Sequence, residues 1–250
     1  VDYNIKEERF NWELIFCELY AGGKYNTLEG ESYEFSLGLN GLGACATQYS
    51  SEYMDVEVKR DGFIYSLHFE HGVNVGGLKK EPYSKKDTGT NIKWKPDIEV
   101  FTDINVPVEY YRNTLKRQAI VNPNVVFVLR IQQNGKFDEE SFVYKKGIED
   151  YIGEIAGDDG LTEIQVWSAE RRGRDRADKP EYKVRLNVAC CFSNKKNLLE
   201  YYHNSSWLEY GGSPEKAVRS AFVSQIDAYL KQNSKYLKNE SKITFQDIQD

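Results

Sequence analysis

The chain has 250 residues, with 33 Lys+Arg against 39 Asp+Glu and a formal net charge of −6. This acidic balance excludes a histone-like protein that binds nucleic acid by bulk charge. Hydrophobic residues at 40% and charged residues at 29% are typical of a chain that buries a core, so we expect one or two ordered domains. The longest apolar runs are far shorter than the roughly 20 residues that cross a bilayer, which predicts no membrane partner.

Four cysteines, Cys17, Cys45, Cys190 and Cys191, lack the C-x-x-C spacing of a metal knuckle or a redox pair. Adjacent residues of a strand point to opposite faces, so we expect one of Cys190 and Cys191 in the core, the other at the surface, and no disulfide between them. We therefore expect a reducing, cytoplasmic compartment. The chain starts at Val1 without a signal segment and contains one methionine, which suggests a piece of a longer protein.

The first part of the chain predicts a mixture of helices and hairpins. An apolar stripe over 9–20 predicts a helix that Gly22 and Gly23 end. Residues 24–43 are rich in glycine and have no sustained period, which predicts a mobile lid. We then expect, in chain order, a short helix at 44–50, a hairpin at 54–69 turning at Asp61-Gly62, a strand at 90–94, a helix at 107–120, a hairpin at 125–144 turning at Asn134-Gly135, and a short helix at 147–155.

The second part begins after a polar, turn-forming linker at Asp158-Asp159-Gly160. We expect strands at 161–168 and 182–188, a helix at 213–232 with Ser213 as N-cap and Pro214 at its first position, and a last helix capped by Thr244. The apolar face of the long helix is expected to contain Ala217, Ala221, Phe222, Ile226, Tyr229 and Leu230. The sequence thus predicts an α+β chain of two domains, 1–157 and 158–250.

The glycines that precede residue 44 carry the strongest chemical signal. Gly38, Gly41 and Gly43 let backbone N–H groups converge on an anion, and a helix that begins at Gly43 would direct its positive end at the same point. Lys24 is available as the counter-charge. This composition suits a triphosphate, although neither a Walker A loop nor a G-x-G-x-x-G fingerprint is present, and a purely structural glycine-rich turn is the alternative.

Two other clusters have simpler interpretations. The basic run Arg171–Arg176 lies in a loop between strands, where such charges are usually solvated; contact with DNA phosphates is the alternative hypothesis. Strand alternation puts His68 and Glu70 on one face and His71 on the other, so these side chains do not converge on a metal. No serine or cysteine has a nearby His and acid at a spacing that indicates a nucleophile.

The order of several short motifs resembles a known family. The motifs are Tyr20-Ala-Gly-Gly-Lys24, Ser32-Tyr33, Gly38-Leu-Asn-Gly-Leu-Gly43-Ala44, Val56-Glu-Val-Lys-Arg60-Asp-Gly62, Phe69-Glu-His-Gly72 and Thr88-Gly-Thr90. Together they resemble the ATPase region of the B subunit of bacterial type IIA DNA topoisomerases, DNA gyrase or topoisomerase IV, and the resemblance continues to Asp247. It implies a partial ATP-binding sandwich of the gyrase, chaperone, histidine-kinase and MutL (GHKL) superfamily, followed by an incomplete ribosomal-S5-like transducer domain.

The resemblance also implies the residues that bind ATP. They are Lys24, Tyr33, Gly38, Leu39, Asn40, Gly41, Leu42, Gly43 and Thr90. The glycine segment would wrap the phosphates, Lys24 and Tyr33 would sit in the lid, and Thr90 would lie beneath the adenine. Arg60 matches a position at the mouth of the pocket. Asn40 stands where the family commonly has His, and Leu37 where Gly is usual; both leave the backbone role intact.

The catalytic groups of the family fall outside the segment that this chain matches. The Glu that activates water, the Asn that holds Mg²⁺ and the Asp that reads adenine precede the position of Val1, and the Lys that reaches the γ-phosphate follows that of Asp250. We therefore expect no catalytic residue and no metal ligand here, and no ATP hydrolysis by this chain alone.

The resemblance gives the parent protein a function and a set of partners. It would use ATP and Mg²⁺ to couple nucleotide binding, hydrolysis and subunit dimerisation to DNA strand passage. Its partners would be DNA, the gyrase A or topoisomerase IV A subunit, and a second copy of its own chain. The alternatives are a non-catalytic scaffold or decoy with the same fold, a MutL-type repair protein and a chaperone ATPase. The sequence does not distinguish gyrase from topoisomerase IV.

Overall fold

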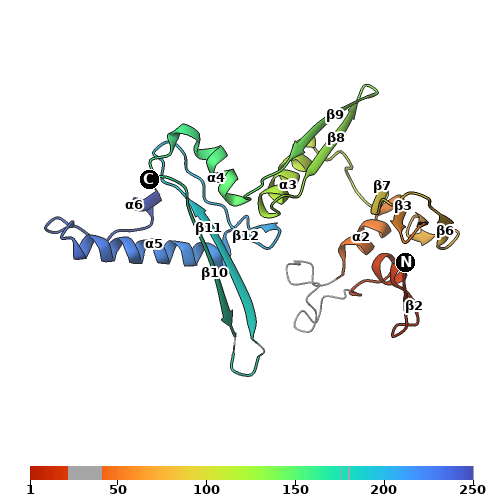
Figure 1. The fold of residues 1–250 in the computed structure, drawn as a ribbon, viewed down its shortest axis with the longest axis horizontal. Helices are drawn as coiled ribbons and strands as arrows, with labels where there is room; N and C mark the ends of the chain where they lie inside the picture. Colours follow the sequence, from red (N-terminus) through yellow and green to blue (C-terminus); the bar gives the residue numbers. More distant parts are fainter. Residues whose placement is uncertain (22–40, 175, 180, 250) are drawn as a thin grey trace. The chain divides into compact units, whose positions relative to one another are not determined.

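The computed structural model describes residues 1–21, 41–174, 176–179 and 181–249. The chain divides into two compact units, Val1–Pro107 and Val108–Asp250, which are described separately (Figure 1). Both units combine helices and antiparallel strands. The domain boundary expected at residue 157 falls inside the second unit and does not coincide with the boundary between the two units. It stays a proposal about function.

The first unit is built on a five-stranded antiparallel sheet. Its strands are β3 (Ser51–Arg60), β4 (Phe63–Glu70), β5 (Val73–Asn74), β6 (Lys79–Pro82) and β7 (Gly89–Pro96), in the order β5-β4-β3-β7, with β6 also paired to β4. The predicted hairpin and the predicted strand are confirmed. Asp61 and Gly62 have φ of 56° and 77°, the left-handed pair that a tight two-residue hairpin turn requires.

Two short helices accompany this sheet. A small hairpin, β1 (Tyr3–Asn4) and β2 (Arg9–Phe10), leads into α1 (Asn11–Cys17), and α2 (Gly43–Tyr49) precedes β3. The helix predicted over 9–20 is confirmed but shorter, because the backbone is already extended at Glu18, with φ −125° and ψ 126°. The helix predicted at 44–50 is confirmed. The lid expected over 24–43 lies outside the described residues apart from its last three.

The core of the first unit follows from strand alternation. Met54 and Val56 of β3 and Leu67 and Phe69 of β4 point to one face, where Phe16 of α1 packs on them. The Phe16 and Phe69 rings lie 5.8 Å apart between centroids, in a tilted contact with 45° between the ring planes. The helix therefore covers one face of the sheet, and the intervening polar residues of β3 and β4 occupy the other.

The second unit begins with a helix that packs against a hairpin. Its elements are α3 (Val108–Val121), β8 (Phe127–Gln133), β9 (Lys136–Phe142), α4 (Ile148–Ala156) and the 3-10 helix η2 (Gly157–Asp159). Figure 1 shows α3 beside the β8–β9 hairpin. Ala119, Ile120 and Tyr144 form the buried centre of this part. Both helices and the hairpin turn at Asn134-Gly135 were predicted from the sequence and are confirmed.

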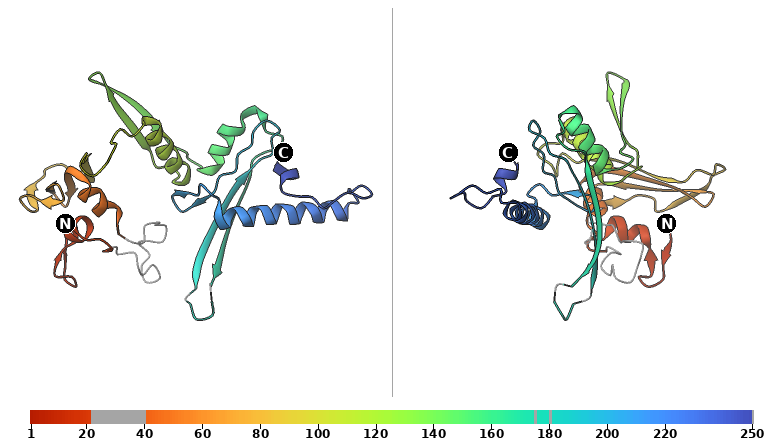
Figure 2. Two further views of the ribbon diagram at one scale, coloured as in Figure 1. Left: turned by 180° about the vertical axis from the view of Figure 1, so that it is seen from behind. Right: turned by 60° about the vertical axis from the view of Figure 1, so that its left-hand side comes forward.

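A long two-stranded ribbon follows, formed by β10 (Gln165–Gly173) and β11 (Tyr182–Cys190) (Figure 2). The first strand starts later than predicted because Leu161 donates its N–H to the carbonyl of Phe192 at 2.7 Å, outside the ladder. Cross-strand partners segregate: Trp167, Ala169, Val184, Leu186 and Val188 share one face, and the polar Ser168, Glu170, Arg172, Lys183, Arg185 and Asn187 share the other. The expected split of Cys190 and Cys191 is wrong, since both are half-buried; neither is in a disulfide.

The remaining elements are β12 (Tyr202–His203), β13 (Ser206–Trp207), α5 (Gly212–Gln232) and α6 (Gln246–Gln249). Ser213 is not the N-cap of α5: Gly211, with φ 64°, holds that position without a side-chain cap. The predicted apolar face is partly wrong, because Ala217, Ala221 and Tyr229 are exposed. Phe222 instead contacts Phe192, which follows β11, with 6.4 Å between ring centroids. A helix does begin near Thr244, but Phe245 stands directly before α6; Thr244 instead donates from N and Oγ1 to Asp247 at 2.7 and 2.6 Å.

Gly147 is a glycine of the second unit that a side chain could not replace without strain. Its φ is 61°, and an added Cβ would lie 2.9 Å from the carbonyl oxygen of Ile120 and 3.1 Å from Cγ of Pro123. We expect Gly147→Ala to lower the free energy of unfolding by about 2 kcal/mol or more, measured by urea denaturation. Gly157 is the matched control, with φ 49° and open space around it, where alanine should cost about 1 kcal/mol. Equal losses at both positions would contradict the steric account.

Candidate functional site

The residues predicted to bind ATP are only partly described. Lys24, Tyr33, Gly38, Leu39 and Asn40 lie outside the described residues. The other four, Gly41, Leu42, Gly43 and Thr90, all belong to the first unit. The structure therefore describes the end of the glycine segment and one position on the sheet.

The glycine segment leads directly into α2. Gly41 has φ 60°, a conformation that glycine adopts without strain. The helix begins at Gly43, where an added Cβ would meet no atom of the described residues within 4 Å. The first N–H groups of a helix have no intrahelical acceptor. Anion binding at this junction stays a prediction.

Thr90 lies on an open part of the sheet. In β7 it is opposite Val58 of β3, and the next pairs on the same face are Val56 with Ile92 and Met54 with Trp94. Along β7 the face is uncovered: Ile92 and Trp94 are 46% and 43% exposed, although Met54 and Val56 are buried. The β7 side of this face is thus an apolar floor that α1 does not cover.

Arg60 ends β3 on the same face and is held by two carboxylates. Its guanidinium donates to Asp2 through Nη2 at 2.6 Å and Nη1 at 3.2 Å, and through Nε to Asp61 at 2.9 Å. The hydrogen bonds from Arg60 lower the pKa of Asp2. This bidentate geometry fixes the plane of the guanidinium. Sequence analysis did not find Asp2, because a partner 58 positions away leaves no local pattern.

The opposite face of the sheet carries a charged triplet. His68 contacts Asp55 through Nδ1 at 2.6 Å and Glu70 through Nε2 at 3.1 Å, whereas His71 contacts Asp97 at 2.9 Å. The predicted separation of His68 and His71 is confirmed. Asp55 was missed, although the hairpin register, which sets Asp55 opposite His68, contained the signal. Within the described ranges, no group of three or more His, Cys, Asp or Glu side chains is arranged to hold a metal ion.

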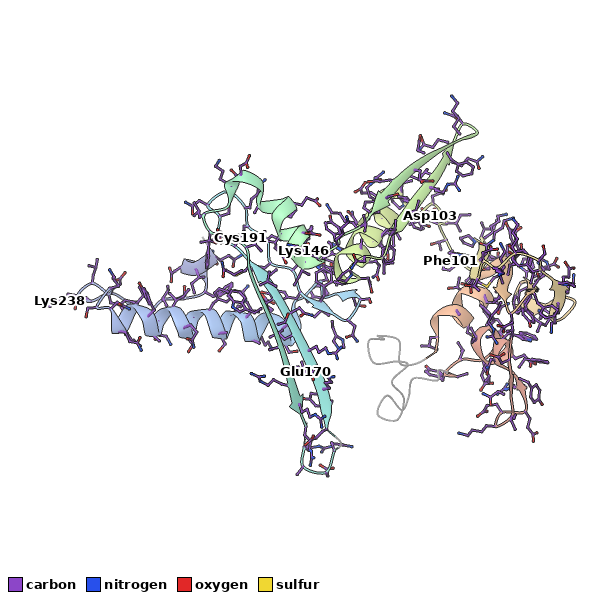
Figure 3. The ribbon with its side chains drawn as sticks, viewed as in Figure 1. Phe101, Asp103, Lys146, Glu170, Cys191 and Lys238 are labelled. Atoms are coloured by element: carbon purple, nitrogen blue, oxygen red, sulfur yellow. The ribbon has the colours of Figure 1, made fainter. Side chains whose placement is uncertain are left out.

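The basic run of the second unit is engaged in short-range pairs. Arg174 lies 3.2 Å from Glu181 and Arg176 lies 3.9 Å from Asp178. On the polar face of the ribbon, Glu170 contacts Lys183 at 3.2 Å and Arg185 at 3.0 Å; Figure 3 labels Glu170 midway along the hairpin. These pairs favour the solvated interpretation of the run. Contact with DNA by Arg171–Arg176 remains a prediction.

Tyrosines and glutamates connect three parts of the second unit. Tyr202 and Tyr151 both donate to Glu200, at 2.7 and 3.4 Å, and burial raises the pKa of Tyr151 to about 12. The guanidinium of Arg117 stacks 3.5 Å above the Trp207 ring, a cation–π contact. Trp207 therefore packs on α3. Segment 200–207 is held to α3 and α4 by these contacts.

Comparison with known proteins identifies the class first. The fold is similar to that of gyrase B and topoisomerase IV ATPase domains. The whole chain aligns with 61% of the 43K ATPase domain of Thermus thermophilus gyrase B, with a TM-score of 0.65 and 22% identity. The topoisomerase IV ATP-binding domain of Francisella tularensis gives a TM-score of 0.62 at 22% identity, over 99% of this chain and 61% of that one. The predicted α+β fold class is confirmed.

Sequence comparison finds similar proteins. Residues 147–250 match the DNA gyrase B family model. The B subunit of DNA topoisomerase 4 from Salmonella typhimurium is 34% identical over 143 residues, which are 57% of this chain and 22% of that protein. The protein of the same name from Staphylococcus aureus (strain Mu50) is 28% identical over 245 residues, 95% of this chain and 34% of its own length. The chain therefore spans about a third or less of the length of these relatives.

His68 gives the first unit a defined dependence of stability on pH. Hydrogen bonds to Asp55, and then to Glu70, raise the pKa of His68 above its ordinary value of 6.5. The stabilisation is therefore fully present below pH 6.5 and is lost as the pH rises through the higher pKa of the folded state. We expect the urea concentration at half-unfolding to decrease as the pH rises from about 6 to about 9, and this decrease to be smaller in His68→Asn. His203→Asn, at an exposed position of the second unit, should leave the fall unchanged; if it flattens the fall equally, the assignment to His68 is wrong.

Proposed function

We propose that this chain is part of the ATPase module in the B subunit of a type IIA DNA topoisomerase. In that module, ATP binding and dimerisation would be coupled to DNA strand passage. The observation that carries the proposal is the similarity to the B subunit of a topoisomerase 4 over 95% of the chain, in a fold that aligns end to end with a gyrase B ATPase domain. The A subunit, DNA and a second copy of the chain are the proposed partners, and the cytoplasm the proposed compartment.

The described residues fit a nucleotide. The start of α2 at Gly43 suits phosphate oxygens, because the first N–H groups of a helix lack intrahelical acceptors and an added Cβ there would meet no described atom within 4 Å. The exposed floor beside Thr90 suits a planar base. Arg60, oriented by Asp2, supplies a fixed positive charge at the edge of that floor. Lys24, Tyr33, Gly38, Leu39 and Asn40 would complete the enclosure as lid and phosphate loop.

Hydrolysis is proposed to need residues beyond this chain. ATP supplies the phosphoanhydride that is cleaved, and cleavage requires a positioned base and a metal ion that neutralises charge on the phosphates. We propose that the chain alone binds nucleotide at most, and that Mg²⁺ is held by the longer protein, because the resemblance implies that the base and the metal ligand lie outside the matched segment.

The boundary at residue 157 is proposed as the start of a transducer segment. α3 and α4 precede this boundary, and the 200–207 segment that follows it contacts both helices through Glu200 and Trp207. A shift of the nucleotide-binding part would then be transmitted at this contact. The competing proposal, a non-catalytic scaffold of the same fold, gives the contact a structural role only. The two proposals differ in their expected activity: a scaffold would not support ATP-dependent strand passage.

The test is a chimera in which residues 1–250 replace the matching segment of the Staphylococcus aureus topoisomerase 4 protein. We expect ATP-dependent decatenation together with the A subunit. Gly43→Val should abolish nucleotide binding without loss of stability, because its side chain would occupy the open space beside the backbone donors. Gly89→Val, at an equally open glycine of β7, should retain binding. A folded chimera that binds no nucleotide would favour the scaffold instead.

A further inference from the structure

Four exposed lysines of the first unit lie close together in the sequence. Lys79 and Lys80 belong to β6, and Lys85 and Lys86 lie in the turn before β7. All four are exposed, and none has a carboxylate at ion-pair distance among the residues that the structure describes. Lys59 and Lys95, by contrast, are paired with Asp87 and Glu52, at 3.8 and 2.5 Å. We call the four side chains the lysine edge.

The lysine edge follows one border of the sheet. β6 pairs with β4 through Ser66–Lys79 and Tyr65–Lys80, and in the described residues it has no second neighbour. Figure 1 shows β6 at the outer margin of this sheet. Side chains of an edge strand alternate between the faces, so long lysines on both faces can reach a ligand that lies along the border.

Aromatic side chains hold this border in position. Nζ of Lys80 lies 3.9 Å from the centroid of the Phe63 ring and 5.5 Å from that of Tyr65. Tyr83 anchors the following turn: its N–H donates to the carbonyl of Gly62 at 2.8 Å, and its hydroxyl donates to Asp87 at 2.8 and 2.9 Å. The lysines therefore project from a fixed backbone, which lowers the entropy lost when they bind.

The lysine edge is positively charged, although the chain as a whole is negatively charged. Residues 79–87 contain four lysines and two carboxylates, Glu81 and Asp87, in a chain of net charge −6. Asp87 lies 3.8 Å from Nζ of Lys59, so its charge is already paired with a cation outside the four lysines. Lysines on an edge strand discourage pairing between sheets. Lys85 and Lys86 lie beyond the strand, where that role does not apply.

We propose that the lysine edge binds the phosphate backbone of duplex DNA without reading its sequence. A row of ammonium groups matches a polymer that carries one negative charge per about 1.7 Å of its axis, and counterion release drives such binding. The inference rests on the proposed function, since DNA is the polyanion on which that function acts. It assigns a DNA contact to the sheet of the first unit, far along the sequence from the basic run of the second.

The test measures the affinity of the 250-residue chain for a fluorescein-labelled duplex by anisotropy at increasing KCl. Changing Lys79, Lys80, Lys85 and Lys86 together to Ala should weaken binding about tenfold or more at low salt. It should also reduce the slope of log K against log salt by about two to four, since each lost phosphate contact removes roughly 0.9. The matched control changes Lys136, Lys145, Lys235 and Lys238 to Ala; these exposed lysines lie in the second unit, and their removal alters net charge equally. The control should keep the slope.

Three results would overturn the inference. Equal losses in the two variants, both folded by circular dichroism, would mean that only net charge matters. Unchanged binding in the first variant, with loss on replacing Arg171, Arg172, Arg174 and Arg176, would move the contact to the ribbon. A poly-aspartate peptide that competes as well as DNA at equal charge would indicate an acidic protein partner. None of these readings depends on nucleotide binding, so a failure of the ATPase proposal would be seen separately.

Discussion

The alternation of β3 is the constraint on which the first unit depends. Met54 and Val56 must be buried, and strand geometry then sends Asp55 and Glu57 to the other side. The apolar face receives α1 and leaves the open floor along β7. The polar face receives the charged triplet around His68. A slip of one residue in this register would exchange the two faces, which is why both the proposed nucleotide floor and the ionic network rest on the same packing.

The proposed nucleotide site combines local and distant contributions. The junction of Gly41 to Gly43 with α2 is local, since conformational freedom and the helix start are adjacent in the chain. The floor at Thr90 and the orientation of Arg60 are not: Thr90 reaches its place through pairing with Val58, and Arg60 is fixed by Asp2. Nucleotide recognition in this chain is therefore proposed as a property of the assembled sheet and not of the glycine segment alone.

Polar contacts in the second unit join segments that are far apart in sequence. Glu200 accepts hydrogen bonds from a helix residue and from its own strand neighbour, and Trp207 provides a platform for Arg117. The β10–β11 ribbon, in contrast, leaves much of its apolar face exposed, with Trp167 at 51% and Leu186 at 53%. These packing contacts of the second unit therefore lie near α3 and α4.

Among the helices of the described residues, none has the length and apolar character of a membrane span.

The sequence by itself determined the hairpins at Asp61-Gly62 and Asn134-Gly135, the start of α2 at Gly43 and the family resemblance, because turn chemistry and strand period act over a few neighbouring residues. Its errors lay where distant contacts compete with local preference. Gly211 replaced Ser213 as the cap of α5, and Ala217, Ala221 and Tyr229 of its expected apolar face are exposed. The tertiary structure alone decided that Asp2 holds Arg60 and that Arg117 stacks on Trp207. Such pairings depend on which surfaces meet after folding, and no local pattern of residues encodes them.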